Sequence, residues 1–478
     1  MSIDRALAQF EASRDAAVGR LCDWLRIPSV STRSEHKEDC RKAGMWLVEQ
    51  LRGLGMGVHL RQTPGHGIVR GSHFGPNDGS PDYRGPHILF YGHYDVQPAE
   101  PLEQWTSPPF EPTIVDGPNG PRIVARGASD DKGQVMMFVE ALRAWKDATG
   151  DIPCRVTLLV EGEEECGSIN LPWYLEQSVD DLVGPHAPHS PCDVALVCDT
   201  GMWDAKSPAI TTSLRGLAYL EVTLKGPGHD LHSGAYGNVV ANPAIELARI
   251  LGNLIDPDTR RVRLAGFYAA VVEAPDDRRA AWQHMNAEEK AYLAAAGVDT
   301  SVGETGYSWL ERQWVRPSLD INGMISGYTA EGAKTIIPAC ASAKVSCRLV
   351  PNQDPEQVEA AFRAWVTEQL PPTITAEFRK HVSANPWAVD PSNPYVQVAA
   401  DCLQEVFDRP AIQMGSGGSI PVVEQMKRIL GIDALLVGFA LPTDRIHAPN
   451  EHFDVARFEY GTRSLIRMLG RFAEMQVR

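Results

Sequence analysis

The chain lacks several features that define whole classes of proteins. None of its nine cysteines belongs to a Cys-x-x-Cys pair, and their odd number and scattered positions are typical of a reducing compartment. A disulfide framework and a structural zinc site are therefore not expected. No apolar run approaches the roughly 18 residues of a membrane helix, and the N-terminus has no apolar core of the signal-peptide type. We expect a soluble, cytoplasmic protein without a membrane partner.

The chain also lacks an excess of positive charge. Its 45 lysines and arginines stand against 61 aspartates and glutamates, which gives a formal net charge of −16. Nucleic acids and anionic membranes need a basic footprint on the protein, so neither is expected as the main partner. The hydrophobic fraction of 43% and the charged fraction of 22% are typical of a folded globular chain, and 478 residues predict two domains.

Short apolar runs alternate with helical patterns in the first two hundred residues, after an opening helix. The runs at 87–93, 154–162 and 192–199 each end in polar, ionisable residues. This alternation predicts an α/β fold of three layers, with a central, mostly parallel sheet between helices. Ligand sites of such sheets lie beyond the carboxyl ends of the strands. We therefore expect the ionisable residues to meet at one site.

The pattern changes near residue 214 and returns after residue 393. The intervening segment contains longer strand-like stretches, such as 343–351, and a helical pattern from about Pro243. We predict a catalytic, metal-binding domain formed by residues 1–213 and 394–478, with an α+β domain, residues 214–393, inserted into it.

Five polar segments carry candidate metal ligands. In YGHYDV, His93 and Asp95 alternate along a strand end and so point to the same side, where one can bind metal while the other orients it. The other segments hold Asp130 and Asp131, the glutamate run 163–165, Asp199, and His447. Taken alone, most of them fit a solvated loop or a helix cap equally well or better. The glutamate run differs, because crowded carboxylates raise one another's pKa unless cations compensate.

Together these segments offer two histidines and three carboxylates, one short of three ligands for each of two metals. One carboxylate would therefore bridge the ions. Two ions roughly 3.5–4 Å apart can lower the pKa of water and polarise a carbonyl oxygen. Mixed imidazole and carboxylate ligands favour zinc, with manganese and cobalt as alternatives. A carboxylate that binds no metal, beside one that does, can act as the general base.

Nine short motifs resemble, in their order, the metallopeptidase family that contains aminoacylase, carboxypeptidase G and the carnosinases, and in particular its carnosinase and cytosolic non-specific dipeptidase branch. The motifs are GHYDVQP, RGASDDKG, EGEEECGS, LVCD, DLHSG, KTIIP, RLVPNQ, GGSIP and HAPNE, and they cover nearly the whole chain. The resemblance implies a homodimeric dipeptidase with two divalent metal ions per subunit. It also implies that the inserted domain serves as a lid and for dimerisation.

The resemblance assigns a role to each candidate residue. Its implied metal ligands are His93, Asp130, Glu165, Asp199 and His447. Of Asp130 and Asp131 the first would be the ligand, because the family pattern is Asp-x-Lys-Gly. Asp130 would bridge, so that one metal takes His93 and Asp199 and the other Glu165 and His447. Asp95 would brace His93, and Glu164 would be the general base, because the second glutamate of the pattern Glu-Glu-x-Gly binds metal.

The same resemblance points to substrate-binding residues in the inserted segment and in a late loop. His232 would stabilise the oxyanion, from the partner subunit, and Arg348 would bind a substrate carboxylate. The remaining implied substrate contacts are Thr335, Gly417, Gly418 and Ser419. Where the branch usually has Arg-x-Gly-Gly-Ser, this chain has glycine at position 415, so the side-chain preference cannot be carried over.

Two other functions fit parts of the pattern. A deacylase of N-acyl amino acids or a carboxypeptidase would use the same mechanism on a different substrate. A binding protein that kept the fold without the chemistry would be expected to lack a ligand or the base, and every expected residue is present. The sequence therefore favours a metal-dependent amide hydrolase acting on small peptides.

Overall fold

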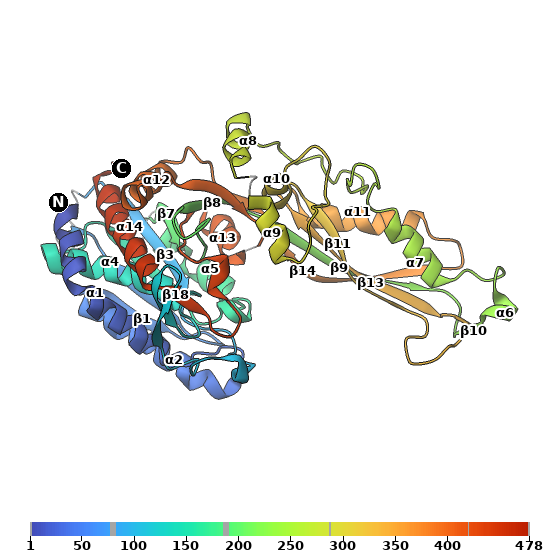
Figure 1. Ribbon diagram of the computed structural model, residues 1–478, viewed down its shortest axis with the longest axis horizontal. Helices are drawn as coiled ribbons and strands as arrows, with labels where there is room; N and C mark the ends of the chain where they lie inside the picture. Colours follow the sequence, from blue (N-terminus) through green and yellow to red (C-terminus); the bar gives the residue numbers. More distant parts are fainter. Residues whose placement is uncertain (1, 77–82, 185–190, 286–287, 419, 477–478) are drawn as a thin grey trace. The chain divides into compact units, whose positions relative to one another are not determined.

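The computed structural model describes residues 2–76, 83–184, 191–285, 288–418 and 420–476. The chain divides into two compact units (Figure 1). The first consists of Met1–Thr212, Val389–Met414 and Gln425–Arg478, and the second of Ser213–Ala388 and Gly415–Glu424. The segment Gly415–Glu424 belongs to the second unit, whereas the sequence placed it in the catalytic domain. Its attachment is local, because Gly415 packs against Trp314 and the backbone N–H of Arg215 donates to the carbonyl of Ser416.

The first unit is built around a mixed sheet in the order β1-β2-β6-β3-β7-β17-β8, with β16 beside β8. The neighbours β6, β3, β7 and β17 are parallel, and the pairs at the edges are antiparallel. The strands are β1 (Gly57–Arg61), β2 (Ile68–His73), β3 (His87–His93), β6 (Arg155–Glu161), β7 (Val194–Val197), β8 (Ala209–Leu214), β16 (Ile412–Ser416) and β17 (Asp433–Leu436). The predicted α/β class is confirmed, with its parallel part in the four central strands.

Helices cover both faces of this sheet. On one face α4 packs against β3, with Phe138 stacked on Phe90, and α1, α2 and α14 adjoin α4. On the other face Glu161 accepts a hydrogen bond from Ser168, shortly before α5. The helices are α1 (Ile3–Leu25), α2 (Lys37–Gly53), α4 (Lys132–Thr149), α5 (Leu171–Leu182), α12 (Pro394–Phe407) and α14 (Val455–Glu474), with a π-helical turn at Met426–Leu430. No helix among the described residues has the length and apolarity that crossing a bilayer requires.

A small antiparallel sheet, in the order β18-β5-β4, completes the first unit. Its strands are β4 (Thr113–Gly117), β5 (Gly120–Val124) and β18 (His452–Asp454). Short 3-10 turns lie at Ser34–His36, Leu102–Gln104, Glu164–Cys166 and Pro442–Asp444. The turn Glu164–Cys166 and the loop before β18 both carry candidate site residues.

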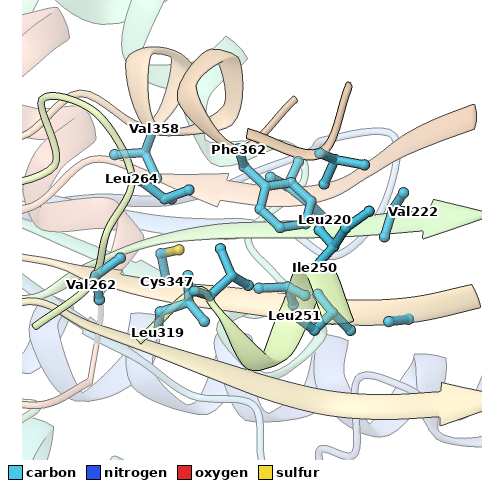
Figure 2. Packing of buried hydrophobic residues seen from close by; sticks show 14 of the residues in the cluster. Leu220, Val222, Ile250, Leu251, Val262, Leu264, Leu319, Cys347, Val358 and Phe362 are labelled. Carbon is cyan, nitrogen blue, oxygen red and sulfur yellow. The ribbon is translucent and has the colours of Figure 1, made fainter. Parts of the chain in front are cut away.

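The second unit contains an antiparallel sheet in the order β11-β13-β9-β14. Its strands are β9 (Gly216–Lys225), β11 (Ser318–Ser326), β13 (Cys340–Leu349) and β14 (Thr375–Ala384). One face is covered by α7 (Pro243–Gly252) and α11 (Pro355–Glu368). Figure 2 shows the apolar core between them, in which Leu220 and Val222 of β9 meet Ile250 and Phe362 of the helices. The alternation of buried and partly exposed residues along β9 and β13 reflects this one-sided burial.

Shorter elements complete the second unit. β10 (Leu231–His232) pairs with β12 (Ile336–Ile337), and β15 (Trp387–Ala388) pairs with the last two residues of β8. The short helices are α6 (Ser233–Tyr236), α8 (Asp276–Gln283), α9 (Glu289–Ala295), α10 (Trp309–Trp314) and α13 (Pro421–Gln425). The predicted start of a helix at Pro243 is observed, and the side chain of Asn242 caps this helix, α7.

Candidate metal centre

The carboxyl ends of the central parallel strands bring the candidate ligands of the first unit together. His93 is the last residue of β3, and Asp199 follows β7. Glu165 lies in the turn after β6, and Asp130 lies just before α4. His447 comes from the loop that leads to β18. These positions follow from the parallel order of β6, β3, β7 and β17, because such strands end at the same edge of the sheet.

The two carboxylate oxygens of Asp130 face different histidines. Oδ1 lies 3.0 Å from Nε2 of His93, which is 4.0 Å from Oδ2 of Asp199. Oδ2 lies 3.0 Å from Nε2 of His447, which is 3.2 Å from Oε2 of Glu165. Each group of three offers ligand atoms that all lie within 4.8 Å of one another, and Asp130 belongs to both groups. Each group could hold one cation, with the carboxylate of Asp130 shared between them.

Burial and crowding perturb the acid groups of this cluster. Burial raises the pKa of Asp199, and the nearby carboxylates of Asp131 and Asp130 raise it further. Burial also raises the pKa of Glu164 to about 7. At Asp130 burial acts in the same direction, but hydrogen bonds with His447 and His93 bring its pKa below the usual range. Carboxylates that are buried and close together are stabilised in their charged form by cations.

At the two histidines the surroundings favour the charged form of the ring. Hydrogen bonds to Asp130 and Glu165 raise the pKa of His447 to about 10. Burial opposes the charged form of His93, but hydrogen bonds to Asp130 and Asp95 raise its pKa well above the ordinary value. His447 also adopts a left-handed backbone conformation with φ of 61°, which is sparsely populated by residues other than glycine. The loop therefore holds the backbone of His447 in an unfavourable conformation.

Asp95 contacts both sides of the cluster. Its Oδ1 lies 3.4 Å from Nδ1 of His93, and its backbone oxygen lies 3.1 Å from the same nitrogen. Its two carboxylate oxygens also accept hydrogen bonds from the backbone N–H groups of Glu164 and Glu165, at 3.2 and 3.0 Å. Asp95 is fully buried. It therefore fixes the ring of one candidate ligand and the backbone of another.

Three residues that orient candidate ligands were not predicted. The side-chain amide of Gln97 donates to Oε2 of Glu165 at 2.6 Å. Asp131 accepts a hydrogen bond from the backbone N–H of His93 at 3.1 Å. Glu451 accepts hydrogen bonds from the backbone N–H groups of Gly127, Ser129 and Asp130, and it pairs with Arg126 at 2.7 Å. Their signal in the sequence is their place within the motifs GHYDVQP, RGASDDKG and HAPNE.

The remaining predicted residues lie in the second unit. His232 is exposed, and its Nδ1 accepts a hydrogen bond from the backbone N–H of Gly234 at 2.9 Å, so the neutral ring carries its proton on Nε2. Thr335 is its neighbour, because the carbonyl of Thr335 accepts a hydrogen bond from the N–H of Ser233. Arg348 lies near the other end of β13. Gly417 and Gly418 lie in the loop after β16, and Ser419 is outside the described residues.

The donor set fits divalent metal ions. It combines two imidazoles with three carboxylates, which zinc, manganese and cobalt accept as ligands. Four of the five side chains are largely buried: their exposed fractions are 0% for His93, 3% for Glu165, 12% for Asp130 and 19% for Asp199. Only His447, at 54%, is open to solvent. Buried charges of one sign at this density are expected where metal ions bind.

Comparison with known proteins places the chain among peptidases. The Cys-Gly metallodipeptidase dug1 of Schizosaccharomyces pombe is 29% identical over 476 residues, which is 96% of each chain. The Beta-Ala-His dipeptidase of Rattus norvegicus is 26% identical, over 97% of this chain and 94% of that one. The solved structure of the M20 family metallo-carboxypeptidase Sso-CP2 from Sulfolobus solfataricus has a TM-score of 0.77 at 28% identity, covering 96% of this chain and 99% of its own.

A family profile also matches most of the chain. The profile of peptidase family M20/M25/M40 matches residues 89–471, which include all five candidate metal ligands and the residues that orient them. The family resemblance expected from the sequence motifs is therefore confirmed. The chain belongs to peptidase family M20/M25/M40.

Proposed function

We propose that the chain is a dipeptidase that depends on two divalent metal ions. The observation that carries the proposal is the position of Asp130, whose two carboxylate oxygens face His93 and His447 in two separate groups of three ligands. When bound, such ions lower the pKa of a water molecule and polarise the carbonyl oxygen of the scissile bond. The dipeptidase names of the Schizosaccharomyces pombe and rat relatives support the choice of substrate class.

Glu164 is proposed as the general base. It stands next to Glu165, but it belongs to neither group of candidate ligands. Its carboxylate would accept a proton from the attacking water and pass it to the leaving amine nitrogen. The hydrogen bond from its backbone N–H to Asp95 supports this role, because it fixes the backbone of Glu164.

Substrate would be held by Arg348, Thr335 and the loop of Gly417, Gly418 and Ser419. Arg348 is suited to a free carboxylate through its planar fork of N–H groups. His232 would donate from Nε2 to the developing oxyanion. The hydrogen bond that Nδ1 accepts from Gly234 supports this role, because the neutral ring then carries its proton on Nε2.

The positions of His232 and Arg348 support a homodimer. β10, which contains His232, lies beyond the point where β9 ends and β13 begins (Figure 1). The carbonyl of Thr335 accepts a hydrogen bond from the N–H of Ser233, directly after β10, whereas Arg348 lies near the opposite end of β13. Cys340 and Arg348 alone are separated by about 26 Å, at roughly 3.3 Å per residue along a strand. A dipeptide cannot reach both His232 and Arg348 of one chain. His232 of a second subunit could complete the site that contains Arg348.

The surface of β11 supports the same arrangement. This strand lies at the edge of its sheet and exposes Ile321, Met324 and Ile325, with exposed fractions of 42%, 52% and 63%. Exposed apolar side chains on an unpaired strand edge favour pairing with another chain. We propose that two subunits associate through this edge, so that the inserted domain serves dimerisation.

Zinc is our proposed metal, with manganese and cobalt as alternatives, and the cytoplasm is our proposed location. The mixed imidazole and carboxylate ligands support the metals. All nine cysteines are free thiols in the structure, in keeping with a reducing compartment.

One experiment tests the reaction and the metal together. The metal-stripped protein is reconstituted with zinc, manganese or cobalt and assayed on free dipeptides, N-acyl amino acids and tripeptides or longer peptides. We expect hydrolysis of dipeptides that depends on added metal and saturates at two ions per chain. Cleavage of N-acyl amino acids alone would contradict the proposal. Cleavage of longer peptides from the C-terminus would favour a carboxypeptidase, the second candidate, which the similarity to Sso-CP2 supports.

A further inference from the structure

Two arginines lie on the same face of the second unit's sheet. Arg348 on β13 is paired with Leu217 on β9, so their side chains leave the sheet on one side. Arg215 precedes Leu217 by two positions in extended chain, and alternation therefore places it on that side too. This face is opposite to the apolar core, to which Ala218 and Cys347 point. The two guanidinium groups thus project from neighbouring strands toward the same space.

Arg215 also contacts the loop after β16. Its Nε donates to the carbonyl of Gly417 at 3.3 Å, and its backbone N–H donates to the carbonyl of Ser416. A methyl group added to Gly417 would lie 3.0 Å from Nη2 of Arg215. The loop itself brings no positive charge, because residues 415–418 are all glycine or serine. Arg215 therefore supplies the positive charge beside this loop.

Within the described part of the chain, no carboxylate lies within ion-pair distance of Arg215 or Arg348. Both side chains are partly buried. The exposed Asp320 on β11 is the acidic group that influences Arg215 from farther away. Burial, and then the proximity of Arg348, lower the pKa of Arg215 to about 10, so the guanidinium group of Arg215 remains charged at neutral pH. Two like charges held together in this way are stabilised by an anion between them.

We infer that Arg215 and Arg348 together bind the C-terminal carboxylate of the substrate, with the Gly417 loop against the peptide. This inference rests on the proposed dipeptidase function and adds Arg215 as a residue that determines specificity. The planar forks of two arginines can donate hydrogen bonds to both oxygens of one carboxylate. A C-terminal amide loses this interaction. A dipeptide that ends in lysine or arginine places a third positive charge at the pair, so it binds less well.

Equilibrium binding tests the inference apart from turnover. The binding of Ala-Gly and of its C-terminal amide is measured by calorimetry on the metal-loaded, full-length Glu164→Ala protein, which cannot turn them over if Glu164 is the base. Arg215→Gln, Arg215→Lys and Arg348→Gln are each added to this background. Lys344→Gln is the matched control, because Lys344 lies on the same face of β13 and is exposed.

Arg215→Gln is expected to weaken the binding of Ala-Gly roughly 10- to 100-fold and to change the binding of the amide by less than roughly twofold. Arg348→Gln should do the same, Arg215→Lys should retain part of the affinity, and Lys344→Gln should have no effect. Equal weakening of both ligands by Arg215→Gln and Arg215→Lys would show that Arg215 only supports the loop. That result, unchanged binding of Ala-Gly, or no binding by the Glu164→Ala background overturns the inference. Absence of dipeptide hydrolysis by the wild type, with binding as expected, would instead refute the proposed function.

Discussion

The backbone N–H of Asp130 donates a hydrogen bond to Oε1 of Glu451 at 3.1 Å. Glu451 follows His447 closely in the same loop, so this contact ties the loop of one candidate ligand to the loop of another. The carboxylate is fully buried and forms an ion pair with Arg126, which is also buried. Residues behind the ligands of a metal site commonly set its affinity, because they fix the ligand geometry.

The first prediction concerns this buried pair. Glu451→Gln removes the charge that compensates Arg126 and weakens the acceptor of three backbone N–H groups. Breaking a buried ion pair from one side costs about 3–5 kcal/mol, so we expect the free energy of unfolding to fall by about 3 kcal/mol. Metal affinity should fall roughly 10- to 100-fold. Urea denaturation and metal titration measure the two effects. The exposed Glu103→Gln is the control, and equal metal affinity in wild type and Glu451→Gln would contradict the prediction.

The second prediction separates the base from its neighbour. Glu164→Ala should retain two metal ions per chain and lose turnover by roughly 100- to 10,000-fold, because the chain then lacks its proton acceptor. Glu165→Ala should lose metal, because its carboxylate belongs to the group with Asp130 and His447. Metal content by mass spectrometry and steady-state kinetics compare the two variants. Loss of metal from Glu164→Ala to the same extent would show that Glu164 is itself a ligand.

Much of this site could be expected from the sequence, because β3 and β6 end in an ionisable residue, Asp199 closely follows β7, and parallel strands end at one edge. His93 and Asp199 follow that rule directly. Glu451 could not be assigned a role in this way. Its partners are backbone N–H groups more than 300 positions away. Every residue type except proline has such a group, so the sequence does not show which of them are contacted.

The second unit shows another limit of sequence patterns. The apolar alternation of β9 and β13 predicts which side chains are buried, but it does not reveal which loop meets the opposite face. The loop at Gly417 lies about 200 positions from Arg215 along the chain, and their contact is made by a backbone carbonyl. For the same reason the sequence pattern does not reveal that Gly415–Glu424 packs with the second unit.

The third prediction is that metal binding releases protons. In the metal-free protein the pKa of His447 is raised to about 10, chiefly by Asp130 and then by Glu165, so the ring is protonated at pH 7.5. A ring that binds metal must be neutral, so metal displaces this proton and affinity falls as the pH falls below about 10. Calorimetric titration with zinc at pH 7.5, in buffers of different ionisation enthalpy, gives the number of protons released. His447→Asn should release about one proton fewer. Heats that do not depend on the buffer would refute this linkage.

The fourth prediction tests the packing behind His93. A methyl group on Gly92 would lie 2.5 Å from Cγ2 of Val135 and 2.7 Å from Oδ2 of Asp131, which accepts a hydrogen bond from the N–H of His93. Gly92→Ala should therefore reduce stability by about 1–3 kcal/mol and weaken metal binding. Gly19→Ala is the matched control, because Gly19 is exposed within α1 and has open space around it. It should raise stability by about 0.5–1 kcal/mol. Similar effects of the two substitutions on denaturant midpoints would contradict the packing argument.

The fifth prediction is that two inactive variants restore each other. In the proposed homodimer His232→Ala would lack the oxyanion donor and Glu164→Ala would lack the base, so each variant alone should be nearly inactive. In a mixed dimer the chain with His232→Ala keeps its own Glu164 and receives His232 from its partner, which completes one site. Random exchange of subunits in an equal mixture should then restore about a quarter of the sites, since half of the twofold dimers are mixed and each has one complete site. Activity is measured before and after exchange under mild denaturant, with each variant alone as control. If His232 acts within its own chain, no mixed dimer contains a complete site, and the activity of the mixture stays at the sum of its parts.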